Sequence, residues 1–469
     1  YTCMKYIYFI MLLSVCLCFG LSGMAEIKMP AIFGDNMVLQ QRSNAAIWGW
    51  ASPQKLVVVK TSWNGKSYTA YADENGKWRL KVQTPSAGGP YTIKINDGKE
   101  KVLNNVLIGE VWLCSGQSNM EMPMRGFSLQ PVRNSQDAIV RAKNKNIRVF
   151  TVQRNYDLSP LDDCIGIWEE ASPESIARTS AVAYYFGRLL NQVEDVPVGL
   201  LITTWGGSSI KAWMSKENLA GFDIYPAKSK AEIKKAVHSP TVLYNAMLHP
   251  LIGYEMRGTI WYQGETDVAI PDLYVDLFKS MVREWRTQWG IGEFPFYYCQ
   301  IAPYKHSKNQ AFFREAQGKC MSIVPNTGMV VTMDADSPDC IHPDKKQEVG
   351  ERLAYWALAE TYGIKGFKYR SPTVKEMKVE GSVAIISFND APNGLIAKNG
   401  EVKGVYVAGK NKKWYKADVS FFENTMRVSA HDVLEPVAVR YAFDEYAPGE
   451  IFSTQGLPVS SFRTDDWTK

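Results

Sequence analysis

The chain has 469 residues, of which 46% are hydrophobic, 22% charged and 12% aromatic, a globular composition that excludes a disordered, collagenous or coiled-coil protein. Lysine and arginine number 53 and aspartate and glutamate 48, so the net charge is only +5. Because this excess is small, there is no electrostatic reason to expect nucleic acid or a membrane surface as a partner.

The first 25 residues have the pattern of an export signal. Lys5 precedes an apolar stretch over 6–20, and small residues follow up to Ala25. This pattern predicts a signal peptide over 1–25, because the apolar stretch is too short and wrongly flanked for a good transmembrane helix. We therefore expect an exported, periplasmic or extracellular protein, of bacterial origin since no Asn-x-Ser/Thr sequon occurs. A lipoprotein anchor at Cys16 stays open, although the valine before it is a poor match.

Three regions differ in their hydrophobic pattern. Short alternating runs separated by turn residues fill 26–105 and predict an N-terminal β-sandwich domain. In 106–370, near-continuous apolar strands such as 198–203 alternate with helical patterns such as 180–193, which predicts an α/β domain with a parallel sheet covered on both faces. Period-two alternation returns in 371–469 and predicts a C-terminal β-rich domain.

A serine follows the first strand of the middle region. The strand ends at Gly116, where glycine permits a sharp turn, and Ser118 comes two residues later. Ligands of open α/β sheets bind at the carboxyl ends of strands, so Ser118 is expected there as a nucleophile. The alternative is a serine that only caps the next helix. Cys114 is a rival nucleophile, but it lies within the strand and is expected to be buried.

A histidine with a nearby carboxylate is the best candidate for the base. Among the five histidines, only His342 has a carboxylate three residues before it, that of Asp339. In a tight loop Asp339 could accept the Nδ1 proton of His342, which would leave Nε2 free to take the proton of Ser118. A histidine with a purely structural role at the start of a helix is the alternative.

Two further strand ends carry hydrogen-bond donors. The pair Gly206-Gly207 follows one strand and can present an exposed backbone N–H, and Gln263 follows another with a side-chain amide. The backbone N–H groups of Ser118 and Gly207 and the Gln263 amide together predict an oxyanion hole. Any one of these loops could have only a structural role. The prediction of an active site therefore depends on the four strand ends taken together, those followed by Ser118, Gly207, Gln263 and His342.

These segments resemble the sialate O-acetylesterase family of the SGNH-hydrolase superfamily. The resemblance is carried by the nucleophile segment, the glycine loop, the third segment and an Asp-x-x-His-Pro pattern, at Cys114–Met120, Trp205–Ser209, Trp261–Asp267 and Asp339–Pro343. It implies an SGNH-type catalytic domain, which is flavodoxin-like and three-layered. The wider superfamily supplies an asparagine where this chain reads Gln263-Gly264-Glu265. Whether Gln263 or Glu265 faces the site therefore stays open, with Asn119 as a possible support.

The resemblance also implies an activity. It implies a serine esterase that removes O-acetyl groups from sialic acid through an acetyl-enzyme, without a metal or organic cofactor. The partner would be an acetylated sugar. Sialic acid carries a carboxylate, which a fixed arginine would bind, and Arg125 and Arg314 are the candidates for this arginine. Scattered cysteines and histidines give no metal-binding pattern. The exact sugar, the acetyl position and the oligomeric state are not predicted.

Three alternatives stay open. One is an acetylesterase on a plant polysaccharide such as xylan. A second is a glycosidase that uses Glu265 and Asp267, which would share one face of an extended segment but leave Ser118 and His342 without a role. The third is a non-catalytic carbohydrate-binding protein. A fluorophosphonate that labels Ser118 would separate an esterase from the last two.

Overall fold

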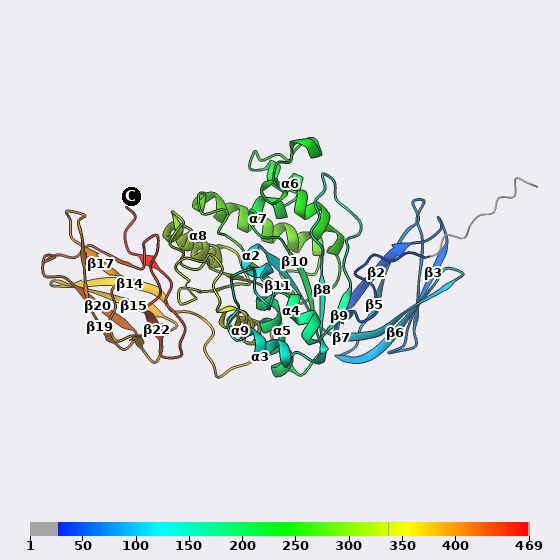
Figure 1. The fold of residues 1–469 in the computed structure, drawn as a ribbon, viewed down its shortest axis with the longest axis horizontal. Helices are drawn as coiled ribbons and strands as arrows, with labels where there is room; N and C mark the ends of the chain where they lie inside the picture. Colours follow the sequence, from blue (N-terminus) through cyan, green and yellow to red (C-terminus); the bar gives the residue numbers. More distant parts are fainter. Residues whose placement is uncertain (1–26, 336, 468–469) are drawn as a thin grey trace, which may run out of the picture.

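The computed structural model describes residues 27–335 and 337–467, so the predicted signal peptide and the candidate anchor Cys16 lie outside the described residues. Three parts of the chain lie in a row, with a β-sheet module at each end and an α/β part between them (Figure 1). Within the described ranges, no helix is long and apolar enough to cross a membrane. The five cysteines in these ranges are all unpaired thiols.

The N-terminal module consists of two sheets that face each other. Strands β2 and β5 form one sheet, and β3, β4, β6 and the first part of β7 form the other, with β1 beside β7. Alternate residues such as Ile47, Val59 and Trp78 are buried, as the period-two pattern predicts. The strand bounds are Val38–Gln40 (β1), Asn44–Trp50 (β2), Leu56–Thr61 (β3), Ser67–Tyr71 (β4), Lys77–Gln83 (β5) and Gly88–Asn96 (β6).

One long strand, β7 (Glu100–Gly116), joins this module to the central sheet. Its first half pairs with β6, and its last seven residues, 110–116, pair with β10 (Val198–Thr204). The boundary predicted between residues 105 and 106 therefore falls inside a continuous strand. The two parts share backbone hydrogen bonds instead of being joined by a linker.

The central sheet has the order β13-β12-β11-β7-β10-β8-β9. All its neighbouring strands run parallel except β9, which pairs antiparallel with β8. The strands β10, β11 and β12 are buried throughout, which confirms the predicted α/β part with a largely parallel, covered sheet. The remaining bounds are Asn144–Thr151 (β8), Trp168–Ala171 (β9), Gly258–Tyr262 (β11), Phe296–Cys299 (β12) and Thr327–Val330 (β13).

Numbered along the chain from β7, the six parallel strands lie in the order 2-3-1-4-5-6. The five strands β7, β10, β11, β12 and β13, numbered alone, lie in the order 2-1-3-4-5, which is the order of a flavodoxin-like sheet, and β8 extends this sheet at one edge. In both numberings β7 lies between β10 and β11. The ends of β10 and β11 consequently flank the end of β7, where Ser118 follows.

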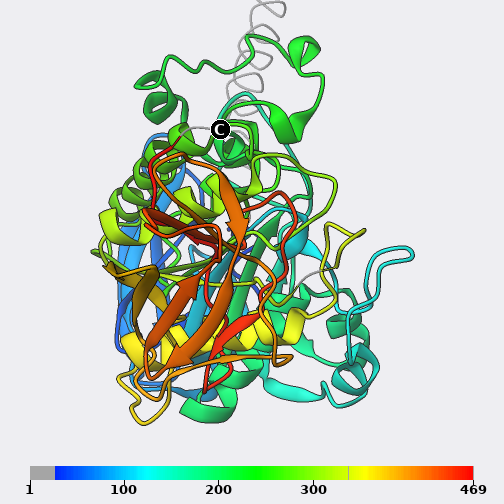
Figure 2. The same ribbon diagram turned by 90° about the vertical axis from the view of Figure 1, so that its left-hand side faces the viewer.

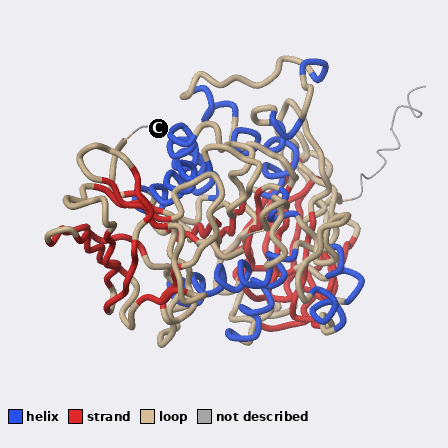
Figure 3. The backbone as a smooth tube through the Cα atoms, turned by 60° about the vertical axis from the view of Figure 1, so that its left-hand side comes forward, coloured by secondary structure: helices blue, strands red, loops and turns tan. Residues whose placement is uncertain are grey.

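Helices cover both faces of this sheet. Helices α5 and α9 pack on each other and on one face, and α7 and α8 pack on each other over the other face (Figure 1). Figure 3 shows helices, in blue, on both sides of the strands, in red. The helix bounds are Ser118–Glu121 (α2), Ser135–Val140 (α3), Pro173–Arg178 (α4), Ala181–Glu194 (α5), Lys216–Ala220 (α6), Pro271–Trp289 (α7), Gln310–Ile323 (α8) and Lys346–Trp356 (α9). Shorter 3-10 or π segments lie at Ile210–Trp213, Lys230–Glu232, Ala236–His238, Tyr244–Leu248, His249–Leu251 and Ala357–Thr361.

The C-terminal module is formed by antiparallel strands and faces the viewer in Figure 2. Its sheets have the orders β14-β15-β20-β19, β18-β17-β21-β23 and β16-β22. The bounds are Thr373–Glu380 (β14), Val383–Asn389 (β15), Leu395–Ala397 (β16), Val405–Ala408 (β17), Trp414–Lys416 (β18), Asp418–Phe422 (β19), Thr425–Ser429 (β20), Ala438–Tyr441 (β21), Ile451–Ser453 (β22) and Phe462–Arg463 (β23).

Candidate active site

The chain turns sharply between β7 and α2 at Gly116. This glycine has a φ of +142°, and a Cβ placed there would lie 2.1 Å from the carbonyl oxygen of Tyr262 in β11. Only glycine therefore fits where the two strands end side by side. Ser118 is the first residue of α2, so it lies at the carboxyl edge of the sheet, where the sequence predicts it.

The structure brings Ser118 and His342 together. The distance from His342 Nε2 to Ser118 Oγ is 2.7 Å, and the ring of Phe127 packs edge-on against the imidazole at 5.2 Å. Burial, and to a lesser degree the positive charge of Lys346, lowers the pKa of His342 from 6.5 to about 4. The imidazole is therefore neutral near pH 7 and can accept the serine proton.

Asp339 lies elsewhere, which corrects the contact predicted from its spacing. Its side chain is 73% exposed, and Oδ1 lies 3.2 Å from His306 Nε2 and 3.4 Å from Lys305 Nζ. These neighbours, His306 first, hold the pKa of Asp339 below its usual value. His342 Nδ1 instead lies 2.6 Å from Oε1 of Gln130, a residue that the sequence reasoning did not consider.

The glycine loop after β10 lies against the nucleophile. A Cβ on Gly206 would approach Ser118 Cβ to 3.3 Å, and the Gly206 N–H donates to Glu121 Oε2 at 2.7 Å. Arg154 Nε donates to the other oxygen of Glu121, also at 2.7 Å. Within the described part of the chain, neither Ser118 N–H nor Gly207 N–H has an acceptor. These two backbone donors, one on Ser118 and one on the residue after Gly206, therefore stay candidates for the predicted oxyanion hole.

Gln263 does not point its amide at Ser118. The Gln263 side chain is fully buried, and its Nε2 donates to Ser208 O at 3.0 Å and to Asp267 Oδ2 at 2.7 Å. An amide nitrogen has two hydrogens, and both are used here. In this structure Gln263 therefore shapes the loop and has no hydrogen left for an oxyanion, contrary to the sequence prediction.

Asn119 and Glu265 belong to a buried network behind the nucleophile. Lys346 Nζ donates to Asn119 Oδ1, and Asn119 Nδ2 donates to Glu265 Oε1, both at 2.5 Å. Burial lowers the pKa of Lys346 to about 8 and raises that of Glu265. Because Glu265 and Asp267 are both bound to protein groups, they do not form the open pair of carboxylates that a glycosidase needs.

The two candidate arginines are placed very differently. Arg314 is fully buried and donates to Ser461 Oγ at 3.0 Å and to Ala442 O and Asp444 O at 3.2 Å, so it fastens α8 to the C-terminal module and is not available to a substrate. Arg125 is exposed, two residues before Phe127, and its role stays a prediction.

Cys114, the rival nucleophile, is fully buried in β7. Burial raises the pKa of its thiol well above the usual range, so almost no thiolate is present near neutral pH. Cys114 is therefore not a competing nucleophile.

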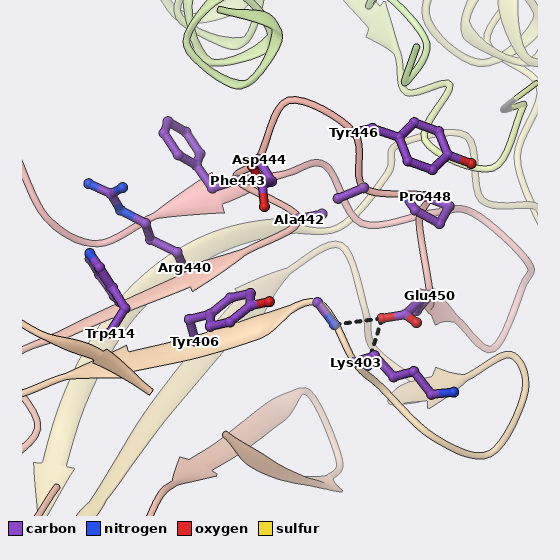
Figure 4. A pocket seen from close by; sticks show the side chains of 12 residues that line it. Lys403, Tyr406, Trp414, Arg440, Ala442, Phe443, Asp444, Tyr446, Pro448 and Glu450 are labelled. Carbon is purple, nitrogen blue, oxygen red and sulfur yellow. Dashed lines mark hydrogen bonds between the residues drawn. The ribbon is translucent and has the colours of Figure 1, made fainter. Parts of the chain in front are cut away.

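A separate pocket of about 500 Å³ lies in the C-terminal module (Figure 4). Tyr406, Trp414 and Phe443 line it, and Arg440 stacks on Trp414 at 4.6 Å while pairing with Asp465. Among the described residues that line this pocket, none belongs to the predicted site. No group of three or more His, Cys, Asp or Glu side chains within the described ranges could hold a metal ion.

Comparisons with known proteins identify the family of the chain. Residues 108–359 match the family described as carbohydrate esterase, sialic acid-specific acetylesterase. The chain is 30% identical to the sialate O-acetylesterase of Homo sapiens over 75% of this chain and 74% of that protein, and 28% identical to that of Mus musculus over 92% and 93%. A carbohydrate acetylesterase structure from Xanthomonas citri has 33% identity and a TM-score of 0.86, covering 94% of this chain and 100% of that one. The chain therefore belongs to the carbohydrate esterase family of sialic acid-specific acetylesterases and is a carboxylic ester hydrolase.

Proposed function

We propose that this chain hydrolyses O-acetyl esters of sialic acid with Ser118 as nucleophile and His342 as general base. The observation that carries the proposal is the 2.7 Å contact between His342 Nε2 and Ser118 Oγ. Membership of the family supports the substrate class. Four polar or glycine-rich strand ends at one sheet edge support an SGNH-type catalytic domain.

The geometry supports a two-step mechanism. Ser118 Oγ attacks the acetyl carbonyl carbon while His342 Nε2 takes the hydroxyl proton. The negative charge moves to the carbonyl oxygen, which accepts hydrogen bonds from the N–H groups of Ser118 and Gly207. Each such donor typically lowers the free-energy barrier by about 2.7–4 kcal/mol. The C–O bond to the sugar then breaks, and His342 returns its proton to the departing oxygen. Water then attacks the acetyl carbonyl carbon while His342 takes one of its protons. The bond to Ser118 Oγ breaks, His342 returns this proton to the serine oxygen, and acetate leaves.

The sugar specificity rests on a different part of the site. The relatives from Homo sapiens and Mus musculus are named sialate O-acetylesterases, whereas the Xanthomonas citri structure is described only as a carbohydrate acetylesterase. Arg125 is our candidate for binding the sialic acid carboxylate, because it is exposed and shares a loop with Phe127, which contacts His342. An acetylesterase for a neutral polysaccharide is the second candidate and would not need this arginine.

We also propose that the protein is exported, with a signal peptide over 1–25. The proposed domains are 26–105, 106–370 and 371–469, the first boundary being crossed by β7. The apolar stretch after Lys5 and the change of hydrophobic pattern at each boundary support these divisions.

Acetate release from O-acetylated sialic acid and from acetylated xylan tests the proposal directly. The wild type should act on the sialic acid ester, Ser118→Ala should be inactive, and a fluorophosphonate should label only the protein that has Ser118. Activity of Ser118→Ala within tenfold of wild type would refute the nucleophile. Release from xylan alone would replace the substrate. Arg125→Ala should weaken hydrolysis of the sialic acid ester and leave p-nitrophenyl acetate hydrolysis nearly unchanged.

A further inference from the structure

The pocket in the C-terminal module lies on the outer face of the sheet formed by β18, β17, β21 and β23. Tyr406 in β17 is the register partner of Arg440 in β21, so both side chains project from one face of this sheet. Val407 and Val439, the next pair along the two strands, are fully buried on the other face. The cavity has a volume of about 500 Å³, within the range of about 300–1,000 Å³ that small-molecule sites occupy. It is therefore large enough for a sugar unit.

One wall of the pocket already contains a cation. The guanidinium of Arg440 lies over the ring of Trp414 at 4.6 Å and over that of Phe443 at 5.3 Å. Arg440 Nε and Nη2 donate to the Asp465 carboxylate at 2.9 Å and 2.7 Å, which balances the positive charge. The place that a cationic ligand would take over these rings is therefore occupied by the chain itself.

The ring of Tyr406 is the open aromatic surface of the pocket. Tyr406 is 39% exposed, and no aromatic ring or cation of another described residue stacks on it. Figure 4 shows this ring between Trp414 on one side and Glu450 on the other. The face of an aromatic ring is electron-rich and attracts C–H groups such as those on one face of a sugar ring. The tyrosine hydroxyl can both donate and accept a hydrogen bond.

Two carboxylates supply acceptors to the same pocket. Asp444 Oδ1 accepts the Glu445 N–H at 2.8 Å, and Glu450 Oε2 accepts the N–H groups of Lys403 and Gly404 at 2.8 Å and 2.9 Å. Within the described part of the chain, the second oxygen of each carboxylate has no hydrogen-bond donor. Hydroxyl groups donate strongly to ionised carboxylates, whereas an anionic ligand would be repelled by them.

We propose that this pocket binds a sugar unit of a neutral glycan, with the sugar ring on Tyr406 and its hydroxyl groups donating to Asp444 and Glu450. An open aromatic face beside free acceptors matches a ligand that has both C–H groups and hydroxyl groups. The basic residues of the lining are Lys403 and Arg440, so the four formal charges balance, which favours an uncharged ligand. The inference does not depend on the proposed function, because none of the residues lining the pocket belongs to the predicted active site.

Isothermal titration calorimetry of the full chain with lactose, cellobiose and xylobiose tests the inference. At least one of these neutral disaccharides should bind with a dissociation constant on the order of 1 mM. Tyr406→Ala should weaken this binding about tenfold or more, because the stacking surface is lost. Phe422→Ala is the matched control, since Phe422 is an aromatic residue of the same module that is 67% exposed and outside the pocket, and it should bind as wild type does.

Two further measurements separate this pocket from the active site and from loss of folding. Tyr406→Ala should hydrolyse p-nitrophenyl acetate at the wild-type rate. Asp444→Asn keeps an acceptor for the Glu445 N–H but removes the charge, so it should bind the disaccharide about threefold or more weakly. Thermal denaturation of each variant checks the fold, and Asp444→Asn tests the inference even where Tyr406→Ala does not fold.

The inference is overturned if none of the three disaccharides binds with a dissociation constant below about 10 mM. It is also overturned if Tyr406→Ala and Asp444→Asn both bind as wild type does, because the sugar then binds elsewhere. Choline or N-acetylneuraminic acid provides the last comparison. Binding of either that Tyr406→Ala removes, without binding of a disaccharide, would replace the neutral sugar by a charged ligand and reject the proposal.

Discussion

Replacing Lys346 with methionine should destabilise the protein and disturb the nucleophile, because Lys346 is the cation of the buried network behind Ser118. Its residue surface is only 1% exposed. The network runs from Lys346 Nζ through the side chain of Asn119, the residue after Ser118, to Glu265. One oxygen of the Glu265 carboxylate is buried with no hydrogen-bond partner among the described residues. Burial raises the pKa of Glu265, and its own backbone N–H, the Asn119 amide and then the positive charge of Lys346 oppose this rise.

The expected magnitude follows from what methionine keeps and removes. Methionine retains most of the apolar stem, so little packing is lost. The change removes a charge and a hydrogen-bond donor, and removing one partner of a buried ion pair typically costs about 3–5 kcal/mol. Because Asn119 separates the two charges, we expect the lower end, about 3 kcal/mol. Adding Glu265→Gln should then cost less than it does in wild type, with a coupling energy of about 1–3 kcal/mol.

Urea denaturation of the wild type, both single variants and the double variant measures this coupling. Lys319→Met on α8 is the matched control, because its side chain is 55% exposed, and it should change the free energy of unfolding by less than about 0.5 kcal/mol. The reasoning fails if Lys346→Met is no more costly than this control, or if the two changes add within about 0.5 kcal/mol. The kcat of Lys346→Met should also fall, since the Asn119 side chain loses one of its hydrogen bonds.

Four further predictions concern activity and stability. The neutral form of His342 is the active base and its pKa is about 4, so kcat/KM should hold from neutral pH to about pH 5 and fall near pH 4; a fall centred near pH 6.5 would contradict this. By the same shift, this residue should make the folded protein less stable as the pH drops from about 6.5 to about 4, because the unfolded chain binds the proton first, and acid titration of the unfolding midpoint measures this. Glu121→Ala frees the Gly206 N–H and should lower kcat about tenfold with KM nearly unchanged; a raised KM with constant kcat would instead place Glu121 in ground-state binding. Activity should survive dialysis against EDTA, and a loss that a divalent ion restores would overturn the proposed mechanism.

The parts of the fold and site that the sequence predicted correctly depend on local constraints. Near-continuous apolar strands identify a covered parallel sheet because no face of such a strand can tolerate water. Gly116 marks the turn to Ser118 because only glycine fits beside the carbonyl of Tyr262. The continuity of the strand across the boundary predicted after residue 105 could not be seen in the sequence. The hydrophobic pattern changes along β7, whereas its backbone hydrogen bonding to neighbouring strands continues.

The residues that sequence reasoning misplaced or missed depend on partners far along the chain. Arg314 looked like a substrate-binding arginine, yet it is buried by contacts with residues 442–461. Gln263 has the right chemistry for an oxyanion donor, but Asp267 and Ser208 take both of its hydrogens. Glu121 could have been found from spacing, since it lies one helical turn from Ser118, and Lys346 is only four residues after His342. Nothing local marks Gln130.

A physical asymmetry explains why the base is readable from the sequence and its partner is not. Nε2 must accept a proton near neutral pH, and among the side chains only histidine does this without a large pKa shift. Nδ1 needs only an acceptor, which an aspartate, a glutamine or a backbone carbonyl can supply from any loop that reaches it. The Asp-x-x-His spacing makes Asp339 a reasonable partner only if the loop folds back on the imidazole. Here Asp339 turns toward Lys305, and the loop of Gln130 supplies the acceptor instead.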